Sequence, residues 1–406
     1  MLFPKTLASA PDARPDSGTL LVMKHTGKLK PFALPGDSLR ERRVLVTGAT
    51  GFVGGRLAER LHLEQRADVV ALVRNWTRAV WVSRYQVEMS QGDVQDFEPV
   101  SEAMKGCDIV FHCASGGGSM AEFMSINVNG TENVIKACLK HGVKRLIYVS
   151  SIAVHGPSPP DGADENDAYR SMNRGYSDSK IEAEKRVLRA GRESDLEVVI
   201  VRPTFVWGPR SALFTVRPLR EIAGGSFRFV DEGQGDCHAV FIETLVDAII
   251  AAATVEDAVG RSYLVTDGYG LKWREFYSRY AELLGVDPDS IGSLSSKSRL
   301  VRWRGAIYQR MGEQLERWKS NPAPLWRKVL RRSTRITADQ LYRFGVMSEW
   351  DLAKFARRGS LNTRSTIELL NGPPRYSYEE AFAMTEAWVR DQLSDDLGIP
   401  RLGSAT

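Results

Sequence analysis

The chain has 406 residues and a net charge of +5; 43% of its residues are hydrophobic and 26% are charged. This composition is typical of a globular protein, and it excludes a mainly disordered, collagen-like or coiled-coil chain. The longest apolar run, residues 245–255, contains Asp247 and is too short to span a bilayer. The N-terminus lacks a basic region followed by an apolar stretch, so we expect no secretory signal.

The four cysteines show no CxxC pair and no metal-ligand spacing. This pattern predicts reduced thiols in a cytoplasmic protein and assigns no metal site. The positive charge is concentrated in residues 297–335, which hold twelve Lys or Arg and two Glu. The basic character therefore belongs to one segment of the chain and not to the whole surface.

Residues 1–41 are rich in proline and small polar residues, which predicts a flexible N-terminal extension. From residue 42, short apolar runs alternate with helix-length stretches. The predicted strands are residues 43–47, 68–73, 87–91, 108–114, 145–151 and 197–203, and the predicted helices are residues 52–63, 97–105 and 126–141. Strands that are apolar throughout indicate a parallel sheet covered on both faces. We therefore predict an α/β fold with a doubly wound Rossmann sheet over residues 42–209.

Beyond residue 209 the alternation weakens. This change predicts a smaller, mixed and mainly helical substrate-binding region over residues 210–395, followed by a tail, residues 396–406. Its expected elements are helices over residues 245–253, 273–284, 300–318 and 378–393 and a strand over residues 262–266. The helix over residues 300–318 is amphipathic and lies within the basic segment 297–335.

The motif TGATGFVG, residues 47–54, directly follows the first predicted strand and opens the first predicted helix. Its three glycines permit a tight turn and the close approach of the backbone to a pyrophosphate, whose charge then lies at the helix N-terminus. This strand-turn-helix context makes the motif specific for a dinucleotide. The expected cofactor contacts from this turn are Gly48, Thr50, Gly51, Phe52, Val53 and Gly54.

Arg74 ends the second strand, where a dinucleotide-binding fold usually has an acidic residue that reads the ribose. A guanidinium attracts a 2′-phosphate, so Arg74, assisted by Arg78, favours NADP(H); NAD(H) stays open. Asp93 follows the third strand and can accept a hydrogen bond from the adenine amino group. The further expected cofactor contacts are Val94, Ala114, Ser115, Asn127, Lys180 and Pro203.

Ser151, Tyr176 and Lys180 form the candidate catalytic set. Tyr176 and Lys180, in YSDSK, lie one turn apart on the same helical face. We expect the ammonium to lower the pKa of the phenol from ~10 by ~3 units, so that Tyr176 can exchange a proton with a carbonyl oxygen. Ser151 ends a strand and can donate a hydrogen bond to the same oxygen.

These motifs, together with VSSIAVHG and RPTFVWGPR, resemble the extended short-chain dehydrogenase/reductases over about residues 42–290. The resemblance implies a nicotinamide cofactor, a Tyr-Lys-Ser site and a substrate region near the C-terminus. It also implies a homodimer packed through residues 126–141 and 176–192. The glycine loop before Asn127 and the long C-terminal region are similar to the 3β-hydroxysteroid dehydrogenase and dihydroflavonol-reductase-like branch, so we expect ketone–alcohol interconversion on a largely apolar or lipid-linked small molecule.

Three other functions are compatible with this fold: a dehydratase, an epimerase and a non-catalytic scaffold. Ile152 and Ala153 follow Ser151 where 4,6-dehydratases carry an acid pair, which disfavours a dehydratase. Residues 233–248 contain no Arg or Lys, which weakens a nucleotide-sugar epimerase with tightly bound NAD but leaves it open, because Arg210 or the basic segment can replace the missing arginine. A non-catalytic cofactor-binding scaffold or sensor typically lacks the Tyr or the Lys.

The basic segment 297–335 also carries three tryptophans. A basic amphipathic helix of this kind can lie at an anionic membrane surface, which would place the enzyme peripherally at the membrane. The alternative is a helix packed on the body with its cations in water. The chain has no recognised nucleic-acid module, so we expect no nucleic-acid partner.

Overall fold

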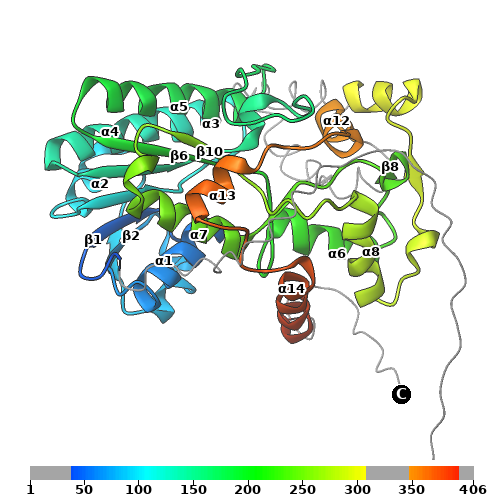
Figure 1. The fold of residues 1–406 in the computed structure, drawn as a ribbon, viewed down its shortest axis with the longest axis horizontal. Helices are drawn as coiled ribbons and strands as arrows, with labels where there is room; N and C mark the ends of the chain where they lie inside the picture. Colours follow the sequence, from blue (N-terminus) through cyan, green and yellow to red (C-terminus); the bar gives the residue numbers. More distant parts are fainter. Residues whose placement is uncertain (1–37, 308–346, 393–406) are drawn as a thin grey trace, which may run out of the picture.

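The computed structural model describes residues 38–307 and 347–392. Its centre is a seven-stranded sheet with strand order β10-β6-β5-β4-β1-β2-β3 (Figure 1). Every neighbouring pair in this sheet is parallel. The strands are β1 (Arg43–Thr47), β2 (Asp68–Val73), β3 (Glu88–Gln91), β4 (Ile109–His112), β5 (Arg145–Val149), β6 (Glu197–Pro203) and β10 (Ser262–Val265). The predicted doubly wound parallel sheet is confirmed.

Helices cover both faces of the sheet (Figure 1). One face carries α2 (Phe97–Ala103), α4 (Gly130–His141) and α5 (Gly175–Glu193), and the other carries α1 (Phe52–Leu63) and α7 (Ile242–Thr254). Helix α7 is buried on all sides from its first residue to Ala253. A helix that is apolar all round belongs inside a protein, which explains why residues 245–255 form the longest apolar run.

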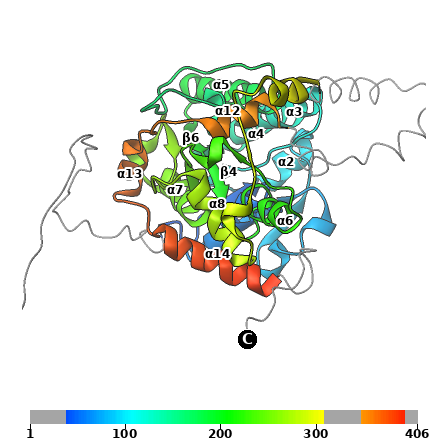
Figure 2. The same cartoon turned by 90° about the vertical axis from the view of Figure 1, so that its right-hand side faces the viewer.

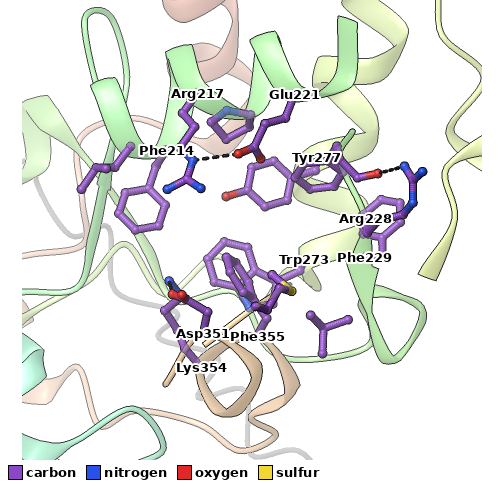
Figure 3. A pocket seen from close by; sticks show the side chains of 15 residues that line it. Phe214, Arg217, Glu221, Arg228, Phe229, Trp273, Tyr277, Asp351, Lys354 and Phe355 are labelled. Atoms are coloured by element: carbon purple, nitrogen blue, oxygen red, sulfur yellow. Dashed lines mark hydrogen bonds and ion pairs between the residues drawn. The ribbon is translucent and has the colours of Figure 1, made fainter. Parts of the chain in front are cut away.

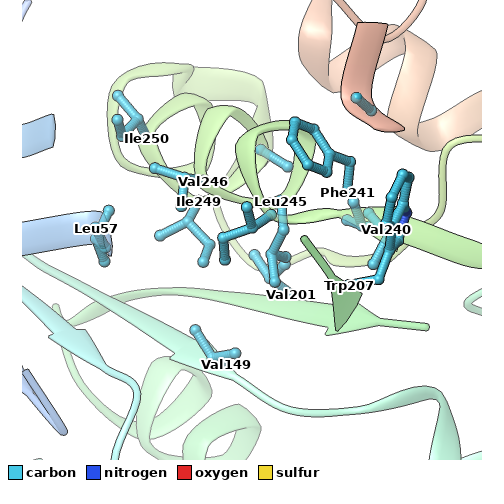
Figure 4. Close-up of a cluster of buried hydrophobic side chains, with 14 of the residues drawn as sticks. Leu57, Val149, Val201, Trp207, Val240, Phe241, Leu245, Val246, Ile249 and Ile250 are labelled. Carbon is cyan, nitrogen blue, oxygen red and sulfur yellow. The ribbon is translucent and has the colours of Figure 1, made fainter. Parts of the chain in front are cut away.

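Successive side chains along a strand point to opposite faces of the sheet, and they form one hydrophobic core on each face. In β1, Leu45 packs in the core under α2 and α4, whereas Val44 and Val46 pack in the core on the α1 and α7 side. Figure 4 shows the second core, where Leu245 and Ile249 of α7 lie over Val201 of β6. Because both faces are covered, neither face of a strand needs polar residues.

The region after residue 209 contributes both to the sheet and to a separate lobe. Strand β10 and helix α7 complete the sheet, while the lobe contains the short parallel pairs β7·β9 and β8·β11 and several helices. The elements of the lobe are β7 (Phe205–Trp207), α6 (Arg217–Ala223), β8 (Phe229–Val230), β9 (Ala239–Phe241), α8 (Trp273–Leu283), β11 (Ser293–Leu294), α12 (Glu349–Ala356) and α14 (Tyr378–Gln392), whereas α13 (Arg364–Leu370) packs against α7 and β10. In Figure 2, α14 lies beside α8, and the rings of Tyr280 and Phe382 join them at 5.6 Å. The mainly helical C-terminal region is thus confirmed.

Several predicted segments fall outside the described residues: nearly all of the extension 1–41, residues 308–335 of the basic segment, and the tail 396–406. Within the described ranges, no helix has the length and apolar character needed to cross a bilayer.

A buried ion-pair cluster attaches α1 to α7. The guanidinium of Arg60, which is 1% exposed, lies 2.7 Å from Asp247 of α7 and 3.3 Å from Glu243. Arg375 contacts the same Asp247 at 3.1 Å. Charges this deeply buried are tolerated only when they are paired, so the cluster specifies one position for α1 and therefore for the glycine turn at its N-terminus.

Candidate active site

The glycine turn lies at the carboxyl end of β1, where the chain order reverses between β1 and β4. Gly48 has a φ of +70°, and a Cβ on it would lie 2.7 Å from the backbone nitrogen of Ala114. A Cβ on Gly54 would lie 2.4 Å from the carbonyl oxygen of Gly48. Such a crevice at a topological switch point is where open α/β sheets bind their ligands.

The N-terminus of α1 has the features of an anion site. Its N-cap is Gly51, no side chain caps the first turn, and no acidic residue lies there. The N–H groups of this turn are therefore available to a phosphate, which the helix dipole also attracts. The residues present fit the pyrophosphate of a dinucleotide.

A cavity of about 340 Å³ runs from this turn across the ends of β2, β3 and β4. It brings together eleven of the predicted cofactor contacts. These are Gly48, Thr50, Gly51, Phe52, Val53, Gly54, Arg74, Asp93, Val94, Ala114 and Ser115. Four other lining residues were not among the predicted contacts: Leu72, Gly92, Cys113 and Ile126.

Arg74 and Asp93 face each other across this cavity. The Arg74 guanidinium lies 3.4 Å from the Asp93 carboxylate, and the arginine side chain is 57% exposed. Arg78 lines the same cavity. Two cations therefore stand at the end of β2, the place where a dinucleotide-binding sheet reads the adenosine ribose.

Asn127 does not line the cavity but supports the loop that does. Its side-chain oxygen accepts hydrogen bonds from the N–H of Gly116 at 2.9 Å and the hydroxyl of Ser115 at 3.3 Å. Its amide nitrogen donates to the Ser179 hydroxyl of α5 at 2.9 Å. Asn127 thus holds the loop after β4 against the helix that carries Tyr176.

Ser151, Tyr176 and Lys180 line one cavity, together with Pro203. Tyr176 and Lys180 lie in the first turns of α5, and Ser151 follows β5. The Ser151 side chain lies close enough to the Tyr176 phenol to lower its pKa. Lys180 is buried, and its ammonium donates to the carbonyl oxygen of Val149 at 2.8 Å. The structure therefore brings together the three side chains selected as the candidate catalytic set.

The protonation of this set differs from the expectation. Removal of the phenol from water in the cavity raises the pKa of Tyr176, although the residue as a whole is 37% exposed, and the Ser151 side chain opposes this effect. Burial also lowers the pKa of Lys180 to about 8, although the negative charge of Glu184 raises it. The expected lowering of the Tyr176 pKa by Lys180 is absent because the ammonium is directed at Val149 and its charge is itself disfavoured by burial.

A buried network fixes α5 against β6. Arg202 of β6 donates through Nε to Glu184 of α5 at 2.9 Å, and both residues are buried. The Arg202 guanidinium also contacts Nε2 of His155 and the carbonyl oxygen of Glu165. Burial and the positive charge of Arg202 lower the pKa of His155, so this histidine is neutral near pH 7. Its role is positional.

The catalytic cavity has a volume of about 500 Å³ and shares Phe52, Val53, Cys113 and Ser115 with the cofactor cavity. The two spaces are therefore continuous. Its wall is largely apolar, and α12 closes its far side with residues that sequence reasoning missed: Trp350, Lys354 and the adjoining Arg357. Within the described ranges, no group of three or more potential metal ligands lies together.

Arg210 does not reach the catalytic cavity. Its guanidinium stacks on the Trp81 ring, 3.8 Å from the centroid, in the loop after β2. The stretch of residues 233–248, which has no Arg or Lys, forms β9 and the start of α7. These positions offer no cation to a substrate diphosphate.

Residues 45–295 match the model of the 3-beta hydroxysteroid dehydrogenase/isomerase family. The chain belongs to this family. A 2-alkyl-3-oxoalkanoate reductase of Stenotrophomonas maltophilia is 32% identical over 311 residues, covering 74% of this chain and 89% of that protein. A 3beta-hydroxysteroid-dehydrogenase/decarboxylase of Arabidopsis thaliana is 31% identical over 62% of this chain and 63% of its own length. As a member of the family, the chain is an NAD(P)-dependent oxidoreductase of the extended short-chain dehydrogenase/reductase type.

The comparisons also include epimerases. A UDP-glucose 4-epimerase of Vibrio cholerae is 30% identical over 61% of this chain and 77% of its own length. Among solved structures, MoeE5 in complex with UDP-glucose and NAD has a TM-score of 0.64 at 22% identity, covering 87% of this chain and all of that chain. Because the sequence identity is only 22%, this structural similarity confirms the fold of the chain and is not evidence for its activity.

Proposed function

We propose that the protein reduces a ketone to a secondary alcohol, or runs the reverse reaction, with NADP(H) as its cofactor. The observation that carries this proposal is the position of Tyr176, Ser151 and Lys180 on a largely apolar cavity that is continuous with the dinucleotide crevice. The resemblance to the 2-alkyl-3-oxoalkanoate reductase and to the hydroxysteroid dehydrogenases, which act on ketones and alcohols, supports the same reaction.

In this proposal, Ser151 orients the carbonyl oxygen and Tyr176 donates a proton to it. The raised pKa of Tyr176 keeps the phenol protonated at neutral pH, which is the state required of a general acid. Lys180 is held at the wall of the same cavity by its hydrogen bond to the carbonyl oxygen of Val149. When bound, the cofactor supplies the hydride in its reduced form and a positive charge in its oxidised form.

Substitution of Arg74 tests the proposed preference for NADPH over NADH. We expect Arg74→Ser to weaken NADPH binding about tenfold and to leave NADH binding nearly unchanged, because an exposed guanidinium contributes about 1–2 kcal/mol to a 2′-phosphate contact. The ratio of the two dissociation constants, from fluorescence titration, measures this. Arg42→Ser is the matched control, because Arg42 also lies 3.4 Å from a carboxylate and is 59% exposed, but it precedes β1 at the amino end of the strands, whereas Arg74 follows β2 at the carboxyl end. An unchanged ratio in Arg74→Ser would remove Arg74 from the proposal.

The alternative is a nucleotide-sugar epimerase with tightly bound NAD, which the Vibrio cholerae relative supports. Two observations count against it: Arg210 stacks on Trp81, and residues 233–248 offer no cation to a diphosphate. A scaffold without turnover is disfavoured because Tyr176 and Lys180 both line the cavity.

We also propose a cytoplasmic homodimer formed through α4 and α5. The two helices pack side by side, and Leu139 of α4 is 48% exposed, as expected for an apolar residue at an interface. Light scattering of the eluted protein gives the mass that decides between one chain and two.

Peripheral contact with a membrane through residues 297–335 is a further proposal. In the described part of this segment, Leu300, Trp303 and Ile307 recur at helical spacing and are all exposed, next to Arg302 and Arg304. Exposed apolar residues beside cations are typical of helices at anionic interfaces. Sedimentation with phosphatidylserine vesicles, compared with phosphatidylcholine vesicles, measures this binding.

A further inference from the structure

A second cavity of about 190 Å³ adjoins the catalytic cavity (Figure 3). It lies between η5–α6 (residues 212–223), α8 and α12. Three residues line both cavities: Leu213, Phe214 and Lys354. The two cavities therefore meet at this junction, and we call the second one the aromatic chamber.

Six of the fifteen residues that line the chamber carry aromatic rings. The lining rings are Phe214, Phe227, Phe229, Trp273, Tyr277 and Phe355. Several of them contact each other, as Trp273 does Phe355 at 4.8 Å and Phe227 does Tyr277 at 5.0 Å. A cavity bounded by rings that are held by one another is preformed, and it favours an apolar occupant.

Two of the three cations that line the chamber are paired with carboxylates, and the third, Arg228, is held by backbone carbonyl oxygens. Lys354 lies 2.8 Å from Asp351, and Arg217 lies 2.7 Å from Glu221. The nearby ammonium lowers the pKa of Asp351 to about 2, so this carboxylate stays ionised at neutral pH. Arg228 donates to the backbone carbonyl oxygens of Gly225 and Phe227.

This pairing decides the chemistry of the occupant. An anion at the junction would have to compete with Asp351 for Lys354, whereas an uncharged chain leaves both pairs intact. The Lys354 ammonium also lies over the Phe355 ring, 4.3 Å from its centroid, so a cation–π contact adds to its pairing with Asp351.

The junction itself is apolar and open. Leu213 is 63% exposed although it is a large aliphatic residue, and it stands beside Phe214 at the border of both cavities. An exposed leucine is ordinary by itself, but one that lines two cavities is covered when a chain passes between them.

We propose that the substrate has two parts: a carbonyl that reaches Tyr176 and an uncharged apolar chain that passes Phe214 and ends in the aromatic chamber. This inference rests on the proposed function for the first part only. The chamber then determines specificity, because each buried methylene contributes ~0.8 kcal/mol, which is about fourfold in affinity.

The test uses methyl decyl ketone with a photoreactive diazirine at its far end, bound in the presence of NADPH. After irradiation, mass spectrometry locates the labelled residues. We expect labels on the chamber wall, chiefly around Phe355 and Tyr277, and we expect excess unlabelled methyl decyl ketone to abolish them. Labels confined to the catalytic cavity, labels elsewhere, or labelling that the competitor does not reduce would overturn the proposal.

Variants add a second measurement. Val230 lines only the aromatic chamber, so Val230→Phe should fill it and reduce the preference for methyl decyl ketone over methyl butyl ketone, in binding, by about tenfold or more. Val259→Phe is the control, because Val259 is at the surface and lines neither cavity. An unchanged preference in a folded Val230→Phe protein would contradict the chamber. Labelling of the chamber without oxidation of NADPH would instead retain the chamber and contradict the proposed reaction.

Discussion

Replacing Tyr176 with phenylalanine should lower kcat by about a thousandfold while leaving the dissociation constant for NADPH nearly unchanged. The phenol is the acidic group that lines, together with Ser151, the cavity adjoining the dinucleotide crevice. Phenylalanine keeps the ring and its edge contact with Phe123 at 6.0 Å but removes the proton. The loss should therefore appear in turnover and not in cofactor binding.

Tyr263→Phe is the matched control for this change. Tyr263 is buried in β10 and lines neither cavity, so this substitution removes a tyrosine hydroxyl away from the site. Its kcat should equal that of the wild type. Steady-state oxidation of NADPH with a reducible ketone, and calorimetric titration with NADPH, give the two quantities. Full turnover by Tyr176→Phe would show that another group supplies the proton.

The second large effect concerns stability and pH. Asp267 follows β10, is buried, and accepts a hydrogen bond from the backbone N–H of Phe241 at 2.5 Å. Burial raises its pKa from 3.8 to about 7. Between pH 4 and pH 7 the Asp267 carboxyl is therefore protonated in the folded protein and ionised in the unfolded chain. The contribution of Asp267 to the free energy of unfolding consequently falls as the pH rises from 4 to 7.

A shift of this size corresponds to about 4 kcal/mol in the free energy of unfolding between pH 4 and pH 8. Asp267→Asn cannot ionise, so it should be more stable than the wild type above pH 7, and the difference should disappear near pH 4. Urea unfolding of both proteins across this range measures the difference directly. Asp257→Asn, at an exposed position, is the control and should follow the wild-type profile. A constant difference between Asp267→Asn and the wild type at all pH values would contradict a buried, titrating carboxyl.

The strands and the cofactor turn could be predicted because their signals are local. The runs that form β1, β2, β4, β5 and β6 are largely apolar, since both faces of the sheet are covered there, whereas the edge strand β3 is mostly polar. Glycine is required at position 48 because a side chain would clash with the backbone after β4, and at position 54 because it would clash with the backbone of Gly48. Such requirements leave a pattern in the sequence.

The remainder of the site depends on contacts between distant segments. Trp350 and Lys354 come to the cavity of Tyr176 from far along the chain, and nothing in the local sequence of α12 indicates this position. The direction of the Tyr176 pKa was also wrong, because spacing on a helix shows that Lys180 is near but not that its ammonium bonds to Val149. Burial, which decides the sign, is a tertiary property.

Calorimetric titration of the purified protein with NADPH and NADH distinguishes the proposed NADP(H)-dependent reductase from the epimerase. Before the titration, a separate sample is denatured and analysed by mass spectrometry for any cofactor carried through purification. We expect exchangeable binding of one cofactor per chain, with NADPH bound about tenfold more tightly than NADH because of the guanidinium at the 2′-phosphate. NAD retained through purification, with no preference for NADPH, would contradict the reductase and favour the epimerase.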